Sequence, residues 1–137
     1  MIYLRVPALL GYRDLVSRAV STACKVAAGK QGTSETVSDE AVTELVSAVG
    51  EAFNNAVLHA YGGREPGEVT VEIRTDGGVV DVAVSDEGRS FDLEAVPEPD
   101  LAALPESGMG LYIIRAFCDE VVYTAGTPNV LRMRKRL

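Results

Sequence analysis

The stretch EAFNNAVLHAY, residues 51–61, decides how the rest of the chain is arranged. It is the second half of a helix predicted from about 39 to 61, because apolar residues recur there and gather on one side at ~100° per residue. That apolar side consists of Val42, Leu45, Val49, Ala52, Phe53, Ala56 and Ala60. Glu51, Asn55 and His59 are spaced four apart, so they stack along the other side of the helix. One side is therefore expected to pack on a core, and the other to present polar groups.

Shorter segments before and after this helix complete a layered fold. Alternation of apolar and polar residues predicts strands, and helical spacing predicts helices, as with Leu15, Ala19, Ala23 and Val26. The expected elements are a strand at 2–6, helices at 11–28 and 39–61, strands at 68–75 and 79–85, a helix at 111–118, and strands at 120–125 and 130–137. This order predicts one α+β domain over residues 1–137. It is a two-layer sandwich whose mixed, mostly antiparallel sheet is covered on one face by helices.

Charge and composition exclude several classes of protein. The chain has 20 acidic and 13 basic residues, a net charge of −7, which argues against nucleic acid as a partner because neutralising phosphates needs surplus Lys and Arg. No apolar run approaches the ~20 residues of a membrane helix. The first residues also lack a signal-peptide pattern, so no membrane association and a cytoplasmic location are expected. Cys24 and Cys118 are expected to be reduced, partly buried thiols.

The polar side of the central helix offers groups suited to phosphate chemistry. The Glu51 carboxylate can accept a proton from water or a hydroxyl. The Asn55 amide oxygen is a hard ligand of the kind that Mg²⁺ accepts. Together they can orient a nucleophile beside a metal-bound phosphate, whereas a solvated helix face is the alternative interpretation of this pair on its own. His59 is interpreted as a hydrogen-bonded structural residue.

Two glycine-containing segments follow the predicted hairpin. Asp86 and Gly88 form either a turn or an adenine contact, in which the carboxylate accepts from the amino group and Gly88 lets the backbone pass close to the base. Gly108-Met109-Gly110 opens a helix whose exposed N–H groups favour phosphate, unless it is merely a flexible lead into the helix. Residues 92–107 between them contain three prolines and are predicted to be a long loop, typical of lids and binding segments.

In this order, the segments resemble the GHKL ATPase superfamily and, within it, the anti-sigma-factor serine kinases. The resemblance rests on residues 51–61, on SDEGRSFD at 85–92 and on SGMGLYII at 107–114, and it covers essentially the whole chain. It implies ATP and Mg²⁺ as cofactors. The site residues that it implies are Glu51 as general base, Asn55 as Mg²⁺ ligand, Asp86 with Gly88 at adenine, Thr127 helping to hold adenine, and Gly108, Met109 and Gly110 near the phosphates.

The resemblance also implies a function and partners. It predicts a serine/threonine protein kinase that acts as an anti-sigma regulatory factor and phosphorylates a STAS-domain anti-anti-sigma protein in a partner-switching circuit. A sigma factor as second partner and a homodimer are compatible with it. Ser90 stands where the superfamily usually has a second glycine, and Glu106 where some relatives carry arginine. Both differences favour the main alternative, a non-catalytic ATP-binding switch that sequesters a regulatory protein. A detached histidine-kinase ATPase domain and a sandwich that binds no nucleotide are further alternatives.

Overall fold

The computed structural model describes residues 1–30, 39–60, 67–91 and 109–137. Its elements are β1 (Ile2–Pro7), a 3-10 turn (Leu10–Tyr12), α1 (Arg13–Lys30), α2 (Asp39–Asn55), a π-helical turn (Ala56–Ala60), β2 (Glu68–Asp76), β3 (Val79–Asp86), α3 (Gly110–Phe117), β4 (Glu120–Thr124) and β5 (Asn129–Arg136). The predicted order of helices and strands is confirmed.

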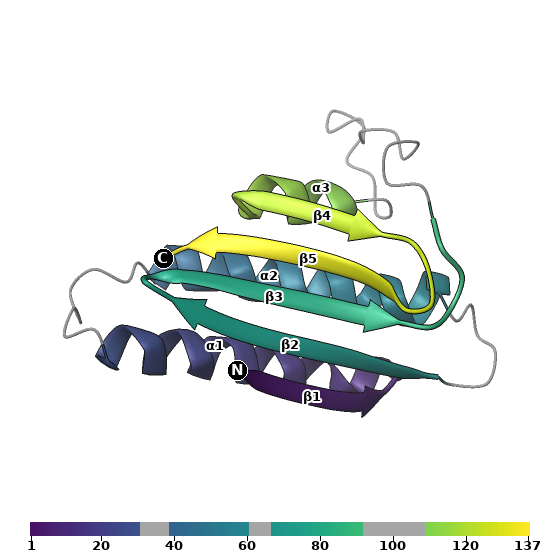
Figure 1. Cartoon of the computed structure of the whole chain (residues 1–137), viewed down its shortest axis with the longest axis horizontal. Coiled ribbons are helices and arrows are strands. Elements are labelled where there is room, and N and C mark those ends of the chain that lie inside the picture. Colours follow the sequence, from purple (N-terminus) through teal and green to yellow (C-terminus); the bar gives the residue numbers. More distant parts are fainter. Residues whose placement is uncertain (31–38, 61–66, 92–108) are drawn as a thin grey trace.

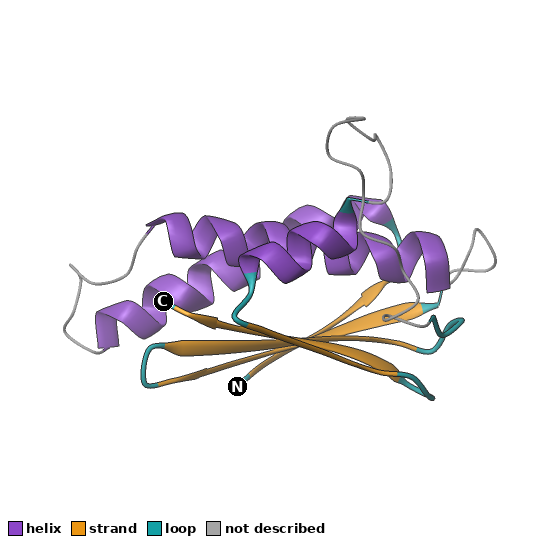
Figure 2. Ribbon diagram, turned by 90° about the horizontal axis from the view of Figure 1, so that it is seen from above, coloured by secondary structure: helices purple, strands orange, loops and turns teal. Residues whose placement is uncertain are grey.

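The strands form one sheet in the order β1-β2-β3-β5-β4. Every strand pair in the described sheet is antiparallel, so the mixed pairing that the sequence allowed is not present there. The helices α1, α2 and α3 lie on one face of the sheet, as Figures 1 and 2 show. The predicted α+β sandwich is therefore confirmed. Because β5 lies beside β3, the start of β5 meets the end of β3 at one edge of the core.

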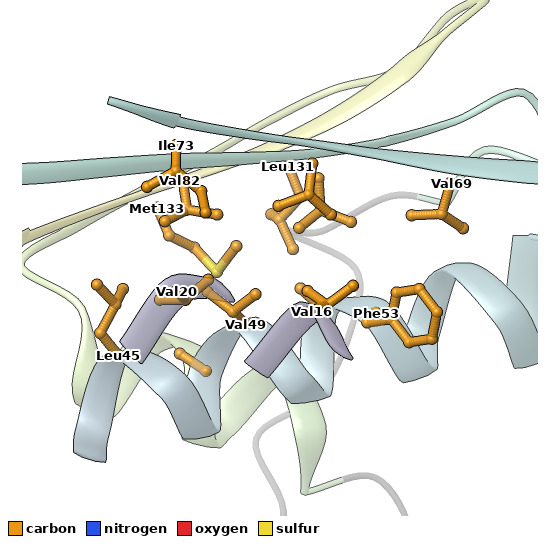
Figure 3. Close-up of a cluster of buried hydrophobic side chains, with 14 of the residues drawn as sticks. Val16, Val20, Leu45, Val49, Phe53, Val69, Ile73, Val82, Leu131 and Met133 are labelled. Carbon is orange, nitrogen blue, oxygen red and sulfur yellow. The ribbon is translucent and has the colours of Figure 1, made fainter. Parts of the chain in front are cut away.

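The hydrophobic core lies between the sheet and the helices α1 and α2 (Figure 3). Its buried strand residues include Val69, Val71, Ile73, Val80, Val82, Val84, Leu131 and Met133. They occupy alternate positions along β2, β3 and β5, as expected when one face of a sheet is covered. The helix α2 adds Leu45, Val49 and Phe53, all fully buried. The predicted apolar side of this helix is confirmed for these residues, and it fixes which face of α2 stays free for polar groups.

The stripe that predicted the helix α1 faces the core only in part, since Ala23 is buried and Ala19 packs against the core. Val16 and Val20 are fully buried, whereas Leu15 and Val26 are about half exposed. Cys24 continues the buried stripe at the same spacing of four. Two apolar stripes one residue apart fit a helix equally well, so spacing alone could not select the buried one.

The long helix changes its geometry where the prediction had it continuous. Its α-helical part ends at Asn55, and residues 56–60 form a π-helical turn. The carbonyl of Ala60, the last residue of this turn, accepts a hydrogen bond from the N–H of Arg89 at 2.8 Å. Such turns add a residue to the helical ladder and often occur at functional sites, but they leave no mark on apolar spacing.

The strand β5 carries basic residues on both of its faces. Lys135 points toward the helices, where its Nζ pairs with the Glu44 carboxylate of α2 at 2.9 Å and both side chains are mostly buried. Arg134 lies on the opposite face and contacts Asp81 of β3 at 3.0 Å. The positive charge of β5 is therefore partly neutralised by acidic residues of α2 and β3.

The two cysteines are free thiols, as predicted. Burial raises the pKa of the Cys24 thiol to about 11, so this side chain acts as a small apolar residue of the core. Among the helices of the described ranges, none combines the length and apolar character needed to cross a membrane.

Candidate functional site

A cluster of polar groups forms where β3 ends and β5 begins, and it is called here the strand-end cluster: Asp86, Gly88, Ser90 and Asn129. Asp86 and Asn129 are register partners across these strands. Asn129 is completely buried. Its Nδ2 donates to Asp86 Oδ1 at 2.9 Å and to the Gly88 carbonyl at 3.0 Å. Its Oδ1 accepts hydrogen bonds from the Gly126 N–H and the Ser90 hydroxyl.

These four hydrogen bonds use both donors and both acceptor positions of the Asn129 amide. A buried amide that is fully paired is rigid and costly to disturb. Both hydrogen bonds described for the Asp86 carboxylate fall on Oδ1, because the Gly88 N–H donates there as well at 3.0 Å. The cluster therefore fixes the orientation of this carboxylate.

Gly88 is required by a contact within the protein. A Cβ built on it would lie 2.3 Å from the carbonyl oxygen of Ala60, which is backbone and cannot move aside. The sequence predicted that Gly88 lets the chain approach a base, and the contact with Ala60 is a second reason for glycine at this position. The structure places it against the π-helical turn, so it joins the end of β3 to the end of the central helix.

A second cluster forms where α3 begins, and it is called here the helix cluster: Glu51, Asn55 and Gly110. A Cβ on Gly110 would lie 3.2 Å from Glu51 Oε2 and 3.3 Å from Asn55 Oδ1. The absence of a side chain at Gly110 thus lets α3 begin directly against the polar side of α2. Met109 precedes this helix, and its carbonyl accepts from the Ile113 N–H at 2.9 Å. Residues from two distant predicted motifs are therefore brought together.

Arg13, the first residue of α1, reaches this cluster as well. Its Nη2 lies 3.5 Å from Glu51 Oε1. Sequence reasoning did not single out Arg13, because nothing in spacing shows which residues of α1 meet α2.

One small hollow joins the two clusters. It has a volume of about 20 Å³, and both Asn55 and Asp86 line it. Ala52, Val84, Arg89 and Leu131 are among its other lining residues. Phe91 and Tyr123 also line it and stack on each other, with ring centroids 4.1 Å apart. A groove of about 440 Å³ between α1 and the strands β1 and β2 is larger but contains none of the predicted site residues.

The remaining predicted residues have different outcomes. Thr127 is exposed in the turn before β5, and the side chain that contacts Asp86 from this region is Asn129. Gly108 and Glu106 lie outside the described residues, as does the side chain of His59. Asn129 was missed, although extending the inward positions Leu131 and Met133 by two residues would have placed it under the helices.

The fold is that of GHKL-type kinase domains. The chain belongs to the family of the histidine kinase-like ATPase domain, whose model matches residues 15–135. Membership of an ATPase-domain family implies ATP as the nucleotide.

Relatives and solved structures agree with this assignment. The serine-protein kinase RsbW of Oceanobacillus iheyensis is 37% identical over 90 residues, which is 60% of this chain and 57% of that protein. The anti-sigma F factor of Halalkalibacterium halodurans is 38% identical over 84 residues, 58% of each chain. These matches span less than two-thirds of the relatives' own length.

The structure of the RsbU and RsbW domains of a Mycobacterium tuberculosis protein has a TM-score of 0.61 at 19% identity and covers 100% of this chain and 33% of that one. The histidine kinase domain of a blue-light activated histidine kinase from Erythrobacter litoralis has a TM-score of 0.59 at 20% identity. The match covers 96% of this chain and 61% of that one. At these identities the two structures support the fold alone.

Proposed function

We propose that residues 1–137 act as one Mg·ATP-dependent serine/threonine kinase domain that serves as an anti-sigma regulatory factor in the cytoplasm. Its substrate is a serine or threonine of a STAS-domain anti-anti-sigma protein, its second partner is a sigma factor, and it works as a homodimer. The names of the relatives support this class of activity. The single observation that carries it is the hollow shared by Asn55 and Asp86, with Gly110 placed against Glu51 and Asn55.

The residues present fit both groups. ATP supplies the phosphoryl group and Mg²⁺ neutralises its charge. Asp86, oriented through Oδ1 by Asn129 and Gly88, accepts the adenine amino group on Oδ2. Thr127, exposed in the turn before β5, is proposed to help hold the adenine as well. Ser90 stands where the superfamily usually has a second glycine. Its hydroxyl donates to Asn129 Oδ1, so the serine adds a hydrogen bond to the cluster.

The helix cluster performs the transfer. Asn55 holds the metal through its amide oxygen, a ligand type that Mg²⁺ combines with phosphate oxygens and water. Gly110 leaves room beside Asn55 and Glu51 for phosphate oxygens, since a side chain there would already be in tight contact with both. Glu51 accepts the proton of the substrate hydroxyl as it attacks. Met109 and Gly108 complete this proposed phosphate contact.

The base-binding part of the hollow must widen to admit a purine. Its volume of about 20 Å³ corresponds to roughly one water molecule. Phe91 and Tyr123 are the aromatic side chains that line it, and they come from the segment after β3 and from the strand β4. Separation of these rings would expose an apolar wall beside Asp86, which is the kind of surface that purines use.

The test is transfer of radiolabelled phosphate from ATP, with Mg²⁺, to STAS-domain proteins encoded in the source genome. The protein should label one of them on serine or threonine. Glu51→Ala should lower the rate about 10²- to 10⁴-fold while calorimetry shows unchanged ATP affinity. Glu40→Gln, an exposed carboxylate in the first turn of the same helix, is the control and should transfer normally. If the protein captures a STAS partner only with ATP but labels nothing, it is the non-catalytic switch instead.

A further inference from the structure

The Glu51 carboxylate is held from two sides. Oε1 faces the guanidinium of Arg13 at 3.5 Å. Oε2 lies on the side of Gly110 and Asn55, 3.2 Å from where a Cβ on Gly110 would be. The two oxygens thus have separate environments, one toward α1 and one toward the proposed phosphates.

The position of Arg13 depends on a glycine in α2. Gly50 is buried in the interior of this helix, directly before Glu51. A Cβ on Gly50 would lie 2.7 Å from Nε and 2.8 Å from Nη2 of Arg13. The guanidinium therefore occupies the space that any other residue at this position would fill. Glycine within a helix is less favourable than alanine, so Gly50 lowers the stability of α2 at the point where Arg13 contacts it.

We infer that Arg13 is a positioning residue for the phosphoryl transfer: seated over Gly50, it holds Oε1 of Glu51 so that Oε2 faces Asn55 and Gly110. This inference rests on the proposed kinase function. A general base must lie within hydrogen-bond reach of the proton that it accepts, and small errors in position lower the rate steeply. The side chain of Glu51 is only 26% exposed, so the guanidinium and the start of α3 are its principal neighbours on these two sides.

Three variants test this role. Arg13→Gln removes the charge and most of the fork of donors, Arg13→Lys keeps a charge on the same side, and Gly50→Ala displaces the guanidinium without altering it. Because the clash at Gly50 involves the end of a flexible side chain, Gly50→Ala should fold and melt at the same or a higher temperature. Arg18→Gln is the matched control, since Arg18 lies on the exposed side of the same helix and pairs only locally with Asp14.

The readout is the rate of phosphate transfer to the STAS protein that the wild type labels, together with ATP affinity by calorimetry. Arg13→Gln and Gly50→Ala should each lower kcat about 10- to 100-fold and leave both the KM for the STAS protein and the ATP Kd unchanged. Arg13→Lys should recover part of the rate. The double variant Arg13→Gln/Gly50→Ala should be no slower than either single one, because both changes remove the same contact.

Other outcomes overturn the inference. Wild-type kcat in Arg13→Gln, or a raised KM or ATP Kd at constant kcat, would mean that Arg13 does not position the base. Crystal structures of the wild type and of Arg13→Gln give a readout independent of activity: the Glu51 carboxylate should turn away from Asn55 in the variant, and an unchanged conformer contradicts the inference. If the wild type transfers no phosphate, the proposed function fails, and the structural comparison then decides only whether Arg13 orients the Glu51 carboxylate.

Discussion

The strand-end cluster and the helix cluster are held together in different ways. In the first, a completely buried amide at the start of β5 makes four hydrogen bonds to the end of β3, to the segment that follows β3 and to the turn before β5. In the second, the polar side chains are half-buried, and the one ion pair described there spans 3.5 Å between side chains that are 42% and 26% exposed. Buried, fully paired networks resist change, whereas exposed pairs contribute little to stability.

This difference separates two tasks. The strand-end cluster acts as a fixed part of the fold, so damage to it should lower both the free energy of unfolding and nucleotide affinity. In the proposed kinase, the helix cluster acts on the reacting groups, and we expect that it can be altered with little effect on the free energy of unfolding. Variants in the two clusters should therefore be distinguishable by which quantity changes.

Gly88→Ala should give the largest effect. Its Cβ would meet the Ala60 backbone at 2.3 Å, so the end of β3 and the π-helical turn must separate. We expect a loss of about 3 kcal/mol in the free energy of unfolding, at the upper end of the usual cost of overpacking, together with loss of ATP binding. Urea denaturation measures the first and calorimetry the second. Gly11→Ala is the control because a Cβ there meets nothing within 4 Å, and equal stabilities of the two variants would contradict the contact.

Asn129→Ala should give the second largest loss in the free energy of unfolding. It leaves the Gly88 carbonyl and the Gly126 N–H without their partner and frees the Asp86 carboxylate to rotate. We expect a loss of about 2 kcal/mol in the free energy of unfolding and a clearly raised ATP Kd. Ser90→Ala removes one hydrogen bond of the same network and should cost less than half as much. Wild-type stability in Asn129→Ala would show that the network does not support the fold.

Asp86→Asn should affect affinity with little change in stability. An amide oxygen can still accept from the Gly88 N–H and Asn129 Nδ2, so the cluster stays paired. The new amide N–H groups would face the amino group of adenine, and we expect the ATP Kd to rise about 20-fold, consistent with loss of one hydrogen bond to a charged acceptor. Calorimetry should show Asp81→Asn, a change elsewhere on β3, to be neutral for ATP. An unchanged Kd in Asp86→Asn would exclude Asp86 from adenine binding.

The fold could be predicted largely from local pattern. Alternation along β2 and β3 fixed their inward faces, and helical spacing fixed the buried face of α2. The π-helical turn at residues 56–60 could not be predicted, because its contacts come from residues almost thirty positions later: the Arg89 N–H donates to the Ala60 carbonyl, and Gly88 lies close against it. The placement of β5 between β3 and β4 is likewise a long-range result that no local pattern contains.

The candidate site could be predicted where a residue's own chemistry was the signal. Glu51, Asn55 and Asp86 were proposed because they place carboxylate and amide groups on the polar side of a helix and at the end of a strand. The structure brings Asn55 and Asp86 to one hollow. Arg13 and Asn129 were missed because their importance lies in which side chain they touch. Contacts between distant segments are set by packing, which a single sequence shows only indirectly.

Gly110→Ala should have the smallest effect on stability and so gives the sharpest test of the helix cluster. Its Cβ would lie 3.2 to 3.3 Å from the ends of two flexible side chains, Glu51 and Asn55, which can yield by a few tenths of an ångström. We therefore expect the free energy of unfolding to stay within about 0.5 kcal/mol of wild type. If these groups hold metal and substrate as proposed, their displacement should lower the rate of phosphate transfer about 3- to 10-fold and raise the Mg²⁺ concentration needed for half-saturation.

Transfer rates over a range of Mg²⁺ concentrations measure this, with Gly11→Ala again as the control. If Gly110 serves only as a flexible lead into α3, the alanine variant should transfer at the wild-type rate with an unchanged Mg²⁺ requirement. If the free energy of unfolding and the rate of phosphate transfer both fall, the helix cluster supports the fold as much as the strand-end cluster does. The division of tasks between the two clusters is then wrong.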